Sequence, residues 1–238
     1  SDCLGAEYRY SDDTLFYAKT DKGYKSGGFT SINEYGPETV LAYEVGAKNR
    51  LLNNRLQLNA SVFLYDYQDQ QVSQLTEEGV QVQNAGSSTV KGIEVETKWM
   101  PTQDDTVDLS VNWLDARYDD FKVRVGDENV DQAGNRLIQA PEWAISGGYE
   151  HFIELSDGST IVPRAQFLYR SESYFTFFNN ANDRQEAYTT IDLSLTYKPA
   201  SQAWLVQAYG RNVTDEVILT SATTSFFTGT NGYQFAAP

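Results

Sequence analysis

The chain has 238 residues, and its 33 acidic and 18 basic side chains give a formal net charge of −15. A charge of this sign repels nucleic acid, and no apolar run approaches the roughly 20 residues that a membrane-spanning helix needs. A single cysteine and a single histidine exclude an internal disulfide, a cysteine-based zinc site and a two-histidine metal cluster. Transmembrane β-barrels are not excluded, because their strands are shorter and alternate.

Alternation of apolar and polar residues is the dominant pattern along the chain. In the clearest segment, Leu58, Ala60 and Val62 share one side of a strand, and Asn59 and Ser61 share the other. No segment shows a comparable helical period. The pattern predicts an all-β, antiparallel, up-and-down structure of about ten strands, at 3–10, 14–23, 38–51, 55–68, 89–100, 106–118, 142–153, 160–170, 187–198 and 203–213.

The predicted connections alternate in length. Short ones, rich in turn residues, occur at 11–13, 53–54, 101–105, 156–158 and 199–202, and long ones at 24–37, 69–88, 119–141, 171–186 and from 214 onward. Short periplasmic turns opposite long extracellular loops are typical of a transmembrane β-barrel. A soluble antiparallel β-sandwich accounts for the alternation equally well, so the asymmetry of the loops is what favours the barrel.

The barrel hypothesis assigns the two sides of each strand. Apolar rows such as Leu41, Tyr43 and Val45 are predicted to face lipid. Charged residues from the opposite rows are predicted to face the lumen and a plug domain: Glu44, Lys48, Glu94, Glu96 and Lys98. Aromatic residues near the strand ends are predicted to form two interfacial girdles: Trp99, Trp143, Trp204, Tyr118, Tyr169 and Tyr188.

An ordered set of motifs resembles the C-terminal half of TonB-dependent outer-membrane receptors. The resembling segments are 17–29, 37–48 and 55–71, then Asn84-Ala85-Gly86, 91–96, 115–118, Ala140-Pro141 with Trp143, and 210–215. The similarity runs nearly end to end. It implies a 22-stranded barrel filled by a separate N-terminal plug domain. Residues 1–238 are then a partial barrel of about ten strands, without the plug domain and the final strand.

The resemblance also implies a location and a set of partners. The location is the bacterial outer membrane, and the partners are membrane lipid, the plug domain, the remainder of the barrel and TonB, which is reached through the missing N-terminal part. The implied cargo is an iron complex, usually a ferric siderophore, while haem, cobalamin and glycans remain open. No covalent step and no cofactor are implied.

The sequence offers little that suggests catalysis or metal binding. His151 lies near a turn, where a surface position is commoner than a catalytic one, and the acidic pairs flank turns or loops. The segment 127–131 resembles the start of a calcium loop, but Gln132 and Ile138 replace the required Gly and Glu. An EF-hand is therefore rejected, which leaves a plain acidic loop or a looser Ca²⁺ site.

The candidate ligand-binding residues are aromatic residues of the long loops, because rings offer a large contact area at little entropic cost. They are Tyr24, Phe29, Tyr35, Tyr174, Phe175, Phe177, Phe178, Phe226, Phe227 and Tyr233. Two alternatives are that these rings pack against one another to order the loops, or that they extend the outer girdle. If the fold were instead a soluble sandwich, the same rings would suit a carbohydrate-binding module.

Overall fold

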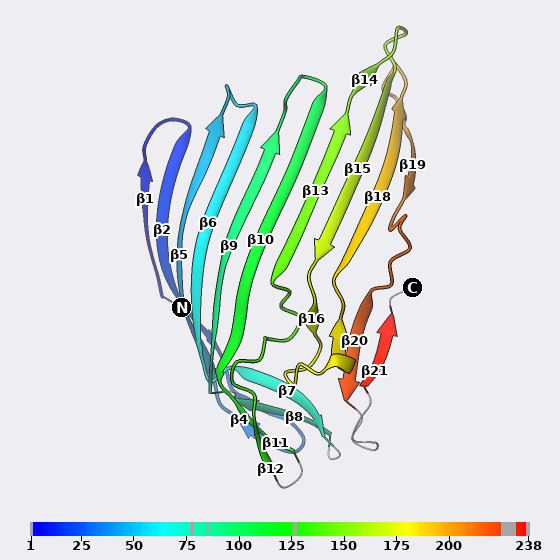
Figure 1. Ribbon diagram of the computed structural model, residues 1–238. Coiled ribbons are helices and arrows are strands. Elements are labelled where there is room, and N and C mark those ends of the chain that lie inside the picture. Colours follow the sequence, from blue (N-terminus) through cyan, green and yellow to red (C-terminus); the bar gives the residue numbers. More distant parts are fainter. Residues whose placement is uncertain (1, 77–78, 85, 126–127, 225–231, 237–238) are drawn as a thin grey trace.

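The computed structural model describes residues 2–76, 79–84, 86–125, 128–224 and 232–236. Ten strands form one curved antiparallel sheet in which each strand pairs with the next one along the chain (Figure 1). They are β1 (Asp2–Arg9), β2 (Thr14–Lys25), β5 (Glu38–Leu51), β6 (Leu56–Gln68), β9 (Ser87–Trp99), β10 (Asp105–Asp120), β13 (Trp143–His151), β15 (Thr160–Arg170), β18 (Tyr188–Lys198) and β19 (Val206–Gly210). The short β14 (Ile153–Glu154) adds to β15. All ten predicted strands are confirmed.

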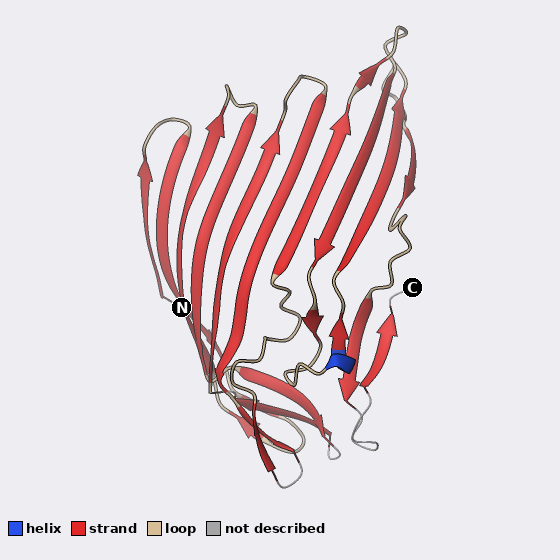
Figure 2. Cartoon of the chain, viewed as in Figure 1, coloured by secondary structure: helices blue, strands red, loops and turns tan. Residues whose placement is uncertain are grey.

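All the short connections lie at one end of the sheet and all the long ones at the other (Figure 2). The long connections contain small two-stranded hairpins that the sequence analysis missed, because they are too short to show a period. They are β3 (Gly28–Phe29) with β4 (Glu34–Tyr35), β7 (Gln71–Thr76) with β8 (Gly79–Asn84), β11 (Lys122–Val125) with β12 (Glu128–Asp131), β16 (Ser173–Tyr174) with β17 (Arg184–Gln185), and β20 (Leu219–Thr224) with β21 (Gly232–Ala236).

Helix is almost absent from the described part of the chain. One turn of 3₁₀ helix, η1 (Ala181–Asp183), lies between β16 and β17. In the described ranges, no helix combines the length and the apolar character needed to cross a membrane.

The register of the sheet aligns the apolar rows. Val45 pairs with Val62, which pairs with Ile93, and their exposed fractions are 55%, 51% and 42%. We call this side of the sheet the apolar face and the opposite side the polar face. No second sheet covers the apolar face in the described residues. The sandwich alternative therefore does not fit, because a sandwich buries its apolar rows between two sheets.

Two glycines let aromatic rings lie flat on the polar face. A Cβ at Gly92 would come within 2.5 Å of Phe63 Cζ, and one at Gly46 within 2.6 Å of the Tyr17 ring. Phe63 also stacks on Tyr65, with 4.8 Å between the ring centroids. The polar face is thus lined by close-lying rings as well as by charges.

The girdle prediction is wrong for Tyr118 and Tyr188, whose exposed fractions are 3% and 8%. Tyr118 opposes Ser88 and Tyr188 opposes Arg170, which places both side chains on the polar side of the sheet. Trp99, Trp143 and Trp204 are exposed, as a girdle requires. The error arises because proximity to a strand end does not tell which face a residue occupies.

Candidate functional site

A hydrogen-bonded carboxylate lies at the centre of the first half of the polar face. The Tyr17 hydroxyl donates to Glu44 Oε1 over 2.6 Å, and Lys19 Nζ lies 2.9 Å from Glu44 Oε2. Because β2 and β5 are neighbours in the sheet, Glu44 meets Tyr17 and Lys19, which lie 27 and 25 positions before it in the sequence. Sequence analysis selected Glu44 but missed its two donors.

A small hollow of about 120 Å³ lies beside Glu44 on the polar face. Its lining includes four of the five charged residues that the sequence assigned to the lumen: Glu44, Lys48, Glu94 and Glu96. The Lys48 ammonium also lies 5.5 Å from the centroid of the Tyr17 ring. Lys98, the fifth, opposes Gln57 and Asp108 on the same face. Three carboxylates against one ammonium make the hollow acidic.

A second charged cluster occupies the other half of the polar face. Arg164 Nη2 donates to Asp108 Oδ1 over 2.6 Å, and Arg164 Nη1 lies 3.9 Å from Glu150 Oε2. The cluster spans β10, β13 and β15, which pair side by side. Sequence analysis missed this cluster.

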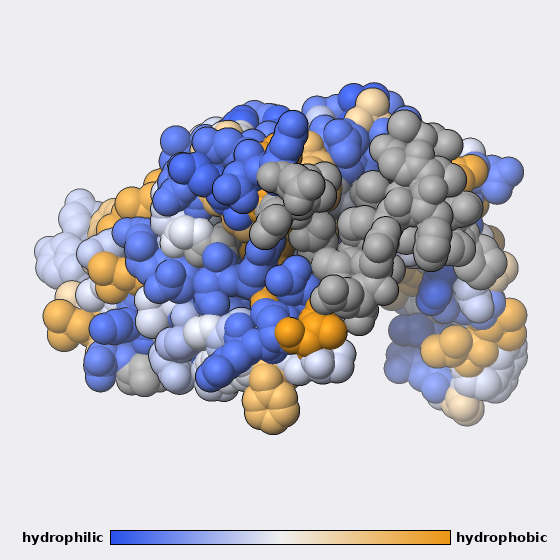
Figure 3. All heavy atoms as spheres, turned by 90° about the horizontal axis from the view of Figure 1, so that it is seen from below, coloured by the Kyte–Doolittle hydropathy of each residue, from blue (hydrophilic) through white to orange (hydrophobic). Residues whose placement is uncertain are grey.

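The long-loop end has a hydrophobic core. The buried side chains of Val72, Tyr118, Phe121, Val123 and Phe177 pack together, with Leu137, Ile138 and Phe178 against them. The Phe121 ring lies 5.0 Å from both the Tyr118 and the Phe177 rings, measured between centroids. Tyr118 belongs to β10, and the other residues come from the second, third and fourth long connections. The outer surface of this end is mostly hydrophilic, with scattered apolar patches (Figure 3).

The loop aromatics selected from the sequence are not all brought together. Phe29 is 85% exposed on the β3–β4 hairpin, Tyr24 is exposed on the apolar side of β2, and the Tyr35 ring lies over Gly28. Tyr174, Phe175 and Phe178 are partly exposed on the fourth connection, whereas Phe177 is only 2% exposed.

Three of the selected aromatics cannot be placed in the same way. Phe226 and Phe227 lie outside the described residues, and of Tyr233 the structure describes the backbone, in β21. The burial of Phe177 agrees with the alternative interpretation, in which the loop rings pack against one another to order the loops.

A chain of alternating charges links the third and fourth connections. Arg136 Nη2 lies 2.6 Å from Glu142 Oε2, and Arg136 Nη1 lies 4.0 Å from Glu172 Oε1. Glu172 also accepts from Arg184 Nη1 over 3.1 Å, and Arg184 pairs with Glu186. The two guanidinium groups thus share one carboxylate.

The fourth connection also holds a buried acid. Asp183 is 2% exposed; its Oδ2 accepts a hydrogen bond from Thr176, and its Oδ1 has no partner. Burial raises the pKa of Asp183, and the hydrogen bond from Thr176 offsets part of this effect.

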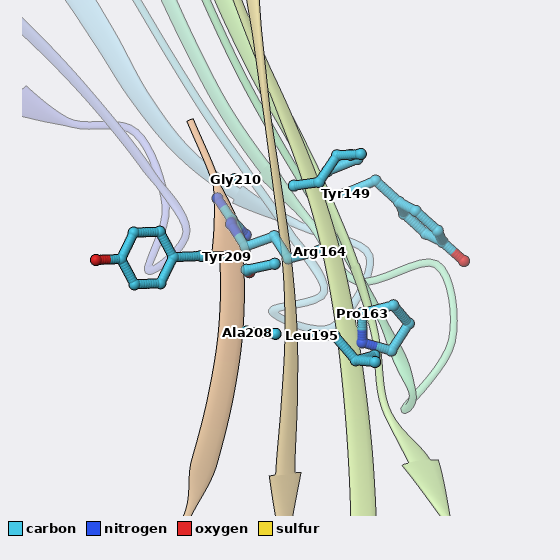
Figure 4. Close-up of a pocket in the computed structure, with 10 residues that line it drawn as sticks. Tyr149, Pro163, Arg164, Leu195, Ala208, Tyr209 and Gly210 are labelled. Carbon is cyan, nitrogen blue, oxygen red and sulfur yellow. The ribbon is translucent and has the colours of Figure 1, made fainter. Parts of the chain in front are cut away.

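A hollow that contains none of the predicted residues lies mainly on the apolar face. It has a volume of about 490 Å³, and its lining runs from Tyr149 on β13 across Ala165 on β15 and Leu195 on β18 to Ala208 on β19 (Figure 4). It is a shallow depression in a surface that is itself apolar.

His151, at the end of β13, takes part in a hydrogen-bonded cross-link to Asp105 of β10. His151 Nδ1 lies 2.7 Å from Asp105 Oδ1, which also accepts from the Tyr149 hydroxyl over 2.6 Å. Thr102 donates to the other carboxylate oxygen of Asp105, so this hydroxyl is bonded to the carboxylate and not to the imidazole. A triad requires the hydroxyl on the imidazole. In the described ranges, no group of three His, Cys, Asp or Glu side chains is placed to hold a metal ion.

Comparison with known proteins gives consistent results. Residues 4–213 match the family model described as "TonB dependent receptor-like, beta-barrel". The pesticin receptor of Yersinia pestis is 25% identical over 219 residues, which are 89% of this chain and 31% of that protein. The metal-pseudopaline receptor of Pseudomonas aeruginosa is 25% identical over 211 residues, 85% of this chain and 28% of that protein.

Solved structures share the fold. The ferric yersiniabactin uptake receptor of Yersinia pestis superposes with a TM-score of 0.82 at 22% identity, over 99% of this chain and 35% of that one. The siderophore receptor of Acinetobacter baumannii gives 0.76 at 19% identity, over 99% and 34%. The chain spans about a third of the length of the curated relatives that it matches.

Proposed function

Because this chain belongs to the family of TonB-dependent receptor-like β-barrels, we propose that it forms part of the wall of an outer-membrane receptor that takes up an iron complex, such as a ferric siderophore. The observation that carries the proposal is the division of one curved sheet into an exposed apolar face and a charged polar face, with every long connection at one end. A barrel wall between lipid and an aqueous lumen requires this division.

The proposal orients the sheet in the membrane. The apolar face contacts lipid, the short turns lie in the periplasm and the long connections lie outside the cell. Charges on the lipid side support this orientation, because they begin beyond the row of Ile93 and Trp113: Lys91 Nζ lies 3.3 Å and Arg117 Nε 2.8 Å from Asp115. This cluster marks the border of the hydrocarbon on the long-loop side.

The polar face then faces the lumen. Glu44, Lys48, Glu94, Glu96 and Lys98 contact the plug domain, and the remainder of the barrel pairs with the outer strands. Support comes from β1 and β19, which end the sheet and each pair with one strand in the described residues. TonB acts through the plug domain, so the wall itself performs no covalent step.

The aromatics of the long connections, from Phe29 through Phe175 and Phe178 to Phe226, Phe227 and Tyr233, are proposed as ligand contacts. Tyr24 is not included, because it lies on the apolar side of β2, where lipid is proposed. The names of similar proteins support an iron or metal chelate, since they include receptors for ferric yersiniabactin, for siderophores and for metal-pseudopaline. The exposed Phe29 and the partly exposed Phe175 offer rings to flat parts of such a chelate.

The test is uptake of radioactive iron by cells whose only iron-complex receptor is the full-length receptor that contains this chain. Ferric yersiniabactin and ferric citrate serve as probes, each with and without TonB. The proposal expects TonB-dependent uptake of at least one probe, reduced about tenfold by Phe175→Ala combined with Phe178→Ala. Phe152→Ala at the short-turn end is the matched control and leaves uptake unchanged.

TonB-independent accumulation, or no uptake of either probe by a receptor that reaches the membrane, contradicts the proposed function. Uptake that is unchanged in the double variant removes these rings from the ligand contacts and leaves the receptor role intact.

A further inference from the structure

The third and fourth long connections, residues 121–142 and 171–187, are joined by side-chain amides that bond to backbone groups. Asn179 Oδ1 accepts from the Arg136 N–H over 2.7 Å, and Asn179 Nδ2 donates to the Arg136 carbonyl over 3.1 Å. Asn135 Nδ2 donates to the Phe177 carbonyl over 2.9 Å. These bonds satisfy backbone groups of one connection with side chains of the other, as neighbouring strands satisfy each other in a sheet.

The same two connections share an apolar interior. Phe177 inserts between connections and meets Phe121 edge-on, at 5.0 Å between centroids and 75° between the ring planes. A backbone bond from Gln139 N–H to the Tyr174 carbonyl, at 2.7 Å, closes the contact at its other side. The shared carboxylate of Glu172 then ties Arg136 to Arg184.

The fourth connection has too little internal structure to order itself. Within 171–187, β16 and β17 make two residue pairs, and η1 is a single turn. Ordering a residue costs about 1–2 kcal/mol, so a 17-residue connection with this little internal pairing needs contacts from outside. The third connection supplies these contacts, and the buried Phe177 side chain completes the apolar core of the third connection.

We propose that residues 121–142 and 171–187 form one cooperative unit, the loop lobe, which opens as a whole. The side chains of Asn135 and Asn179 join its two connections. This inference does not depend on the proposed function.

Hydrogen exchange of the protein in detergent micelles tests the unit, with Asn179→Gly as the variant. Asn179 has a φ of +53°, so glycine removes the side chain without adding backbone strain. Asn180→Gly is the matched control, because Asn180 is the next residue, has a φ of −74° and makes no side-chain capping bond. We expect Asn179→Gly to speed exchange about tenfold in both connections, since two or three hydrogen bonds are lost, and the control to change exchange less than threefold in either.

Faster exchange in 171–187 alone overturns the cooperative unit, as does a control that behaves like Asn179→Gly.

Discussion

The sheet and the loop lobe exclude water in opposite ways. On the sheet, large apolar side chains such as Val45, Leu193 and Leu195 are about half exposed, and nothing in the described residues packs over them. In the lobe, Phe121 and Phe177 are 1% and 2% exposed, and they contact one another. One chain therefore contains a region without a core of its own and a region that has built one.

The difference follows from the solvent that each region is proposed to face. A lipid bilayer is itself apolar, so the sheet needs only to satisfy its backbone groups, and the antiparallel ladder does this. The long connections project into water, where burial of apolar surface helps to order loops. Substitutions that are severe in one region should therefore be mild in the other.

The largest effect is expected for Phe121→Ala, which removes the central ring of the loop core. Truncating a fully buried phenylalanine costs about 3–5 kcal/mol, because transfer free energy and packing are both lost. We expect the opening free energy of residues 121–142 and 171–187, measured by hydrogen exchange, to fall by about this amount. The ladder between β5 and β6 should exchange as before.

Val45→Ala is the corresponding truncation on the apolar face. We expect it to change the stability of the sheet by less than about 1 kcal/mol. The Val45 side chain is 55% exposed in this chain, and in a bilayer it contacts lipid hydrocarbon. An equal loss for the two truncations would mean that the sheet relies on side-chain packing as the lobe does.

A smaller effect is expected when charge is placed on the apolar face. Val45→Lys puts an ammonium near the middle of β5, where the proposed bilayer is thickest, and such substitutions cost about 2–4 kcal/mol in membrane barrels. Urea unfolding of the full-length receptor in lipid vesicles measures this cost. Asn59→Lys is the control on the polar face, beside the acidic hollow, and should be nearly neutral.

The two Lys variants also report on orientation. If Asn59→Lys is the costly one, the polar face, and not the apolar face, contacts lipid. If both are neutral in vesicles, neither face of this segment is embedded.

Sequence alone predicted the sheet well, because a period of two repeats over eight or more residues in every long strand. It also placed Glu44, Glu94 and Glu96 on one face, as the register of β5 and β9 shows. Sequence alone did not predict the lobe. Four rings within 174–178 gave no indication that Phe177 points inward, since that depends on Phe121, more than 50 residues away.

Motifs found through resemblance prove to have structural roles. Asn84 Nδ2 donates to the Asp69 carbonyl over 2.7 Å, and its Oδ1 accepts from the Gly36 N–H over 2.8 Å, so it joins the first and second connections. Asn212 closes the turn after β19 by accepting from the Glu216 N–H over 3.0 Å. Such roles need tertiary partners, which one-dimensional patterns do not contain.

The smallest expected effect is a pH dependence confined to the lobe. Burial raises the pKa of Asp183, so its folded form binds a proton more tightly than the unfolded chain does. The stability that this proton contributes is fully present below the ordinary pKa of an aspartic acid and is lost as pH rises through the higher, folded pKa.

The opening free energy of the lobe should therefore decrease between acid and neutral pH, while the ladder of the sheet shows no matching trend. Asp183→Asn keeps the shape of the side chain and removes its titration, so this variant should flatten the pH profile of the lobe. Hydrogen exchange corrected for the intrinsic pH dependence of amide exchange measures both profiles. A lobe that becomes more stable toward neutral pH would contradict the sign. A variant that retains the full slope would show that Asp183 does not control the pH dependence of the lobe.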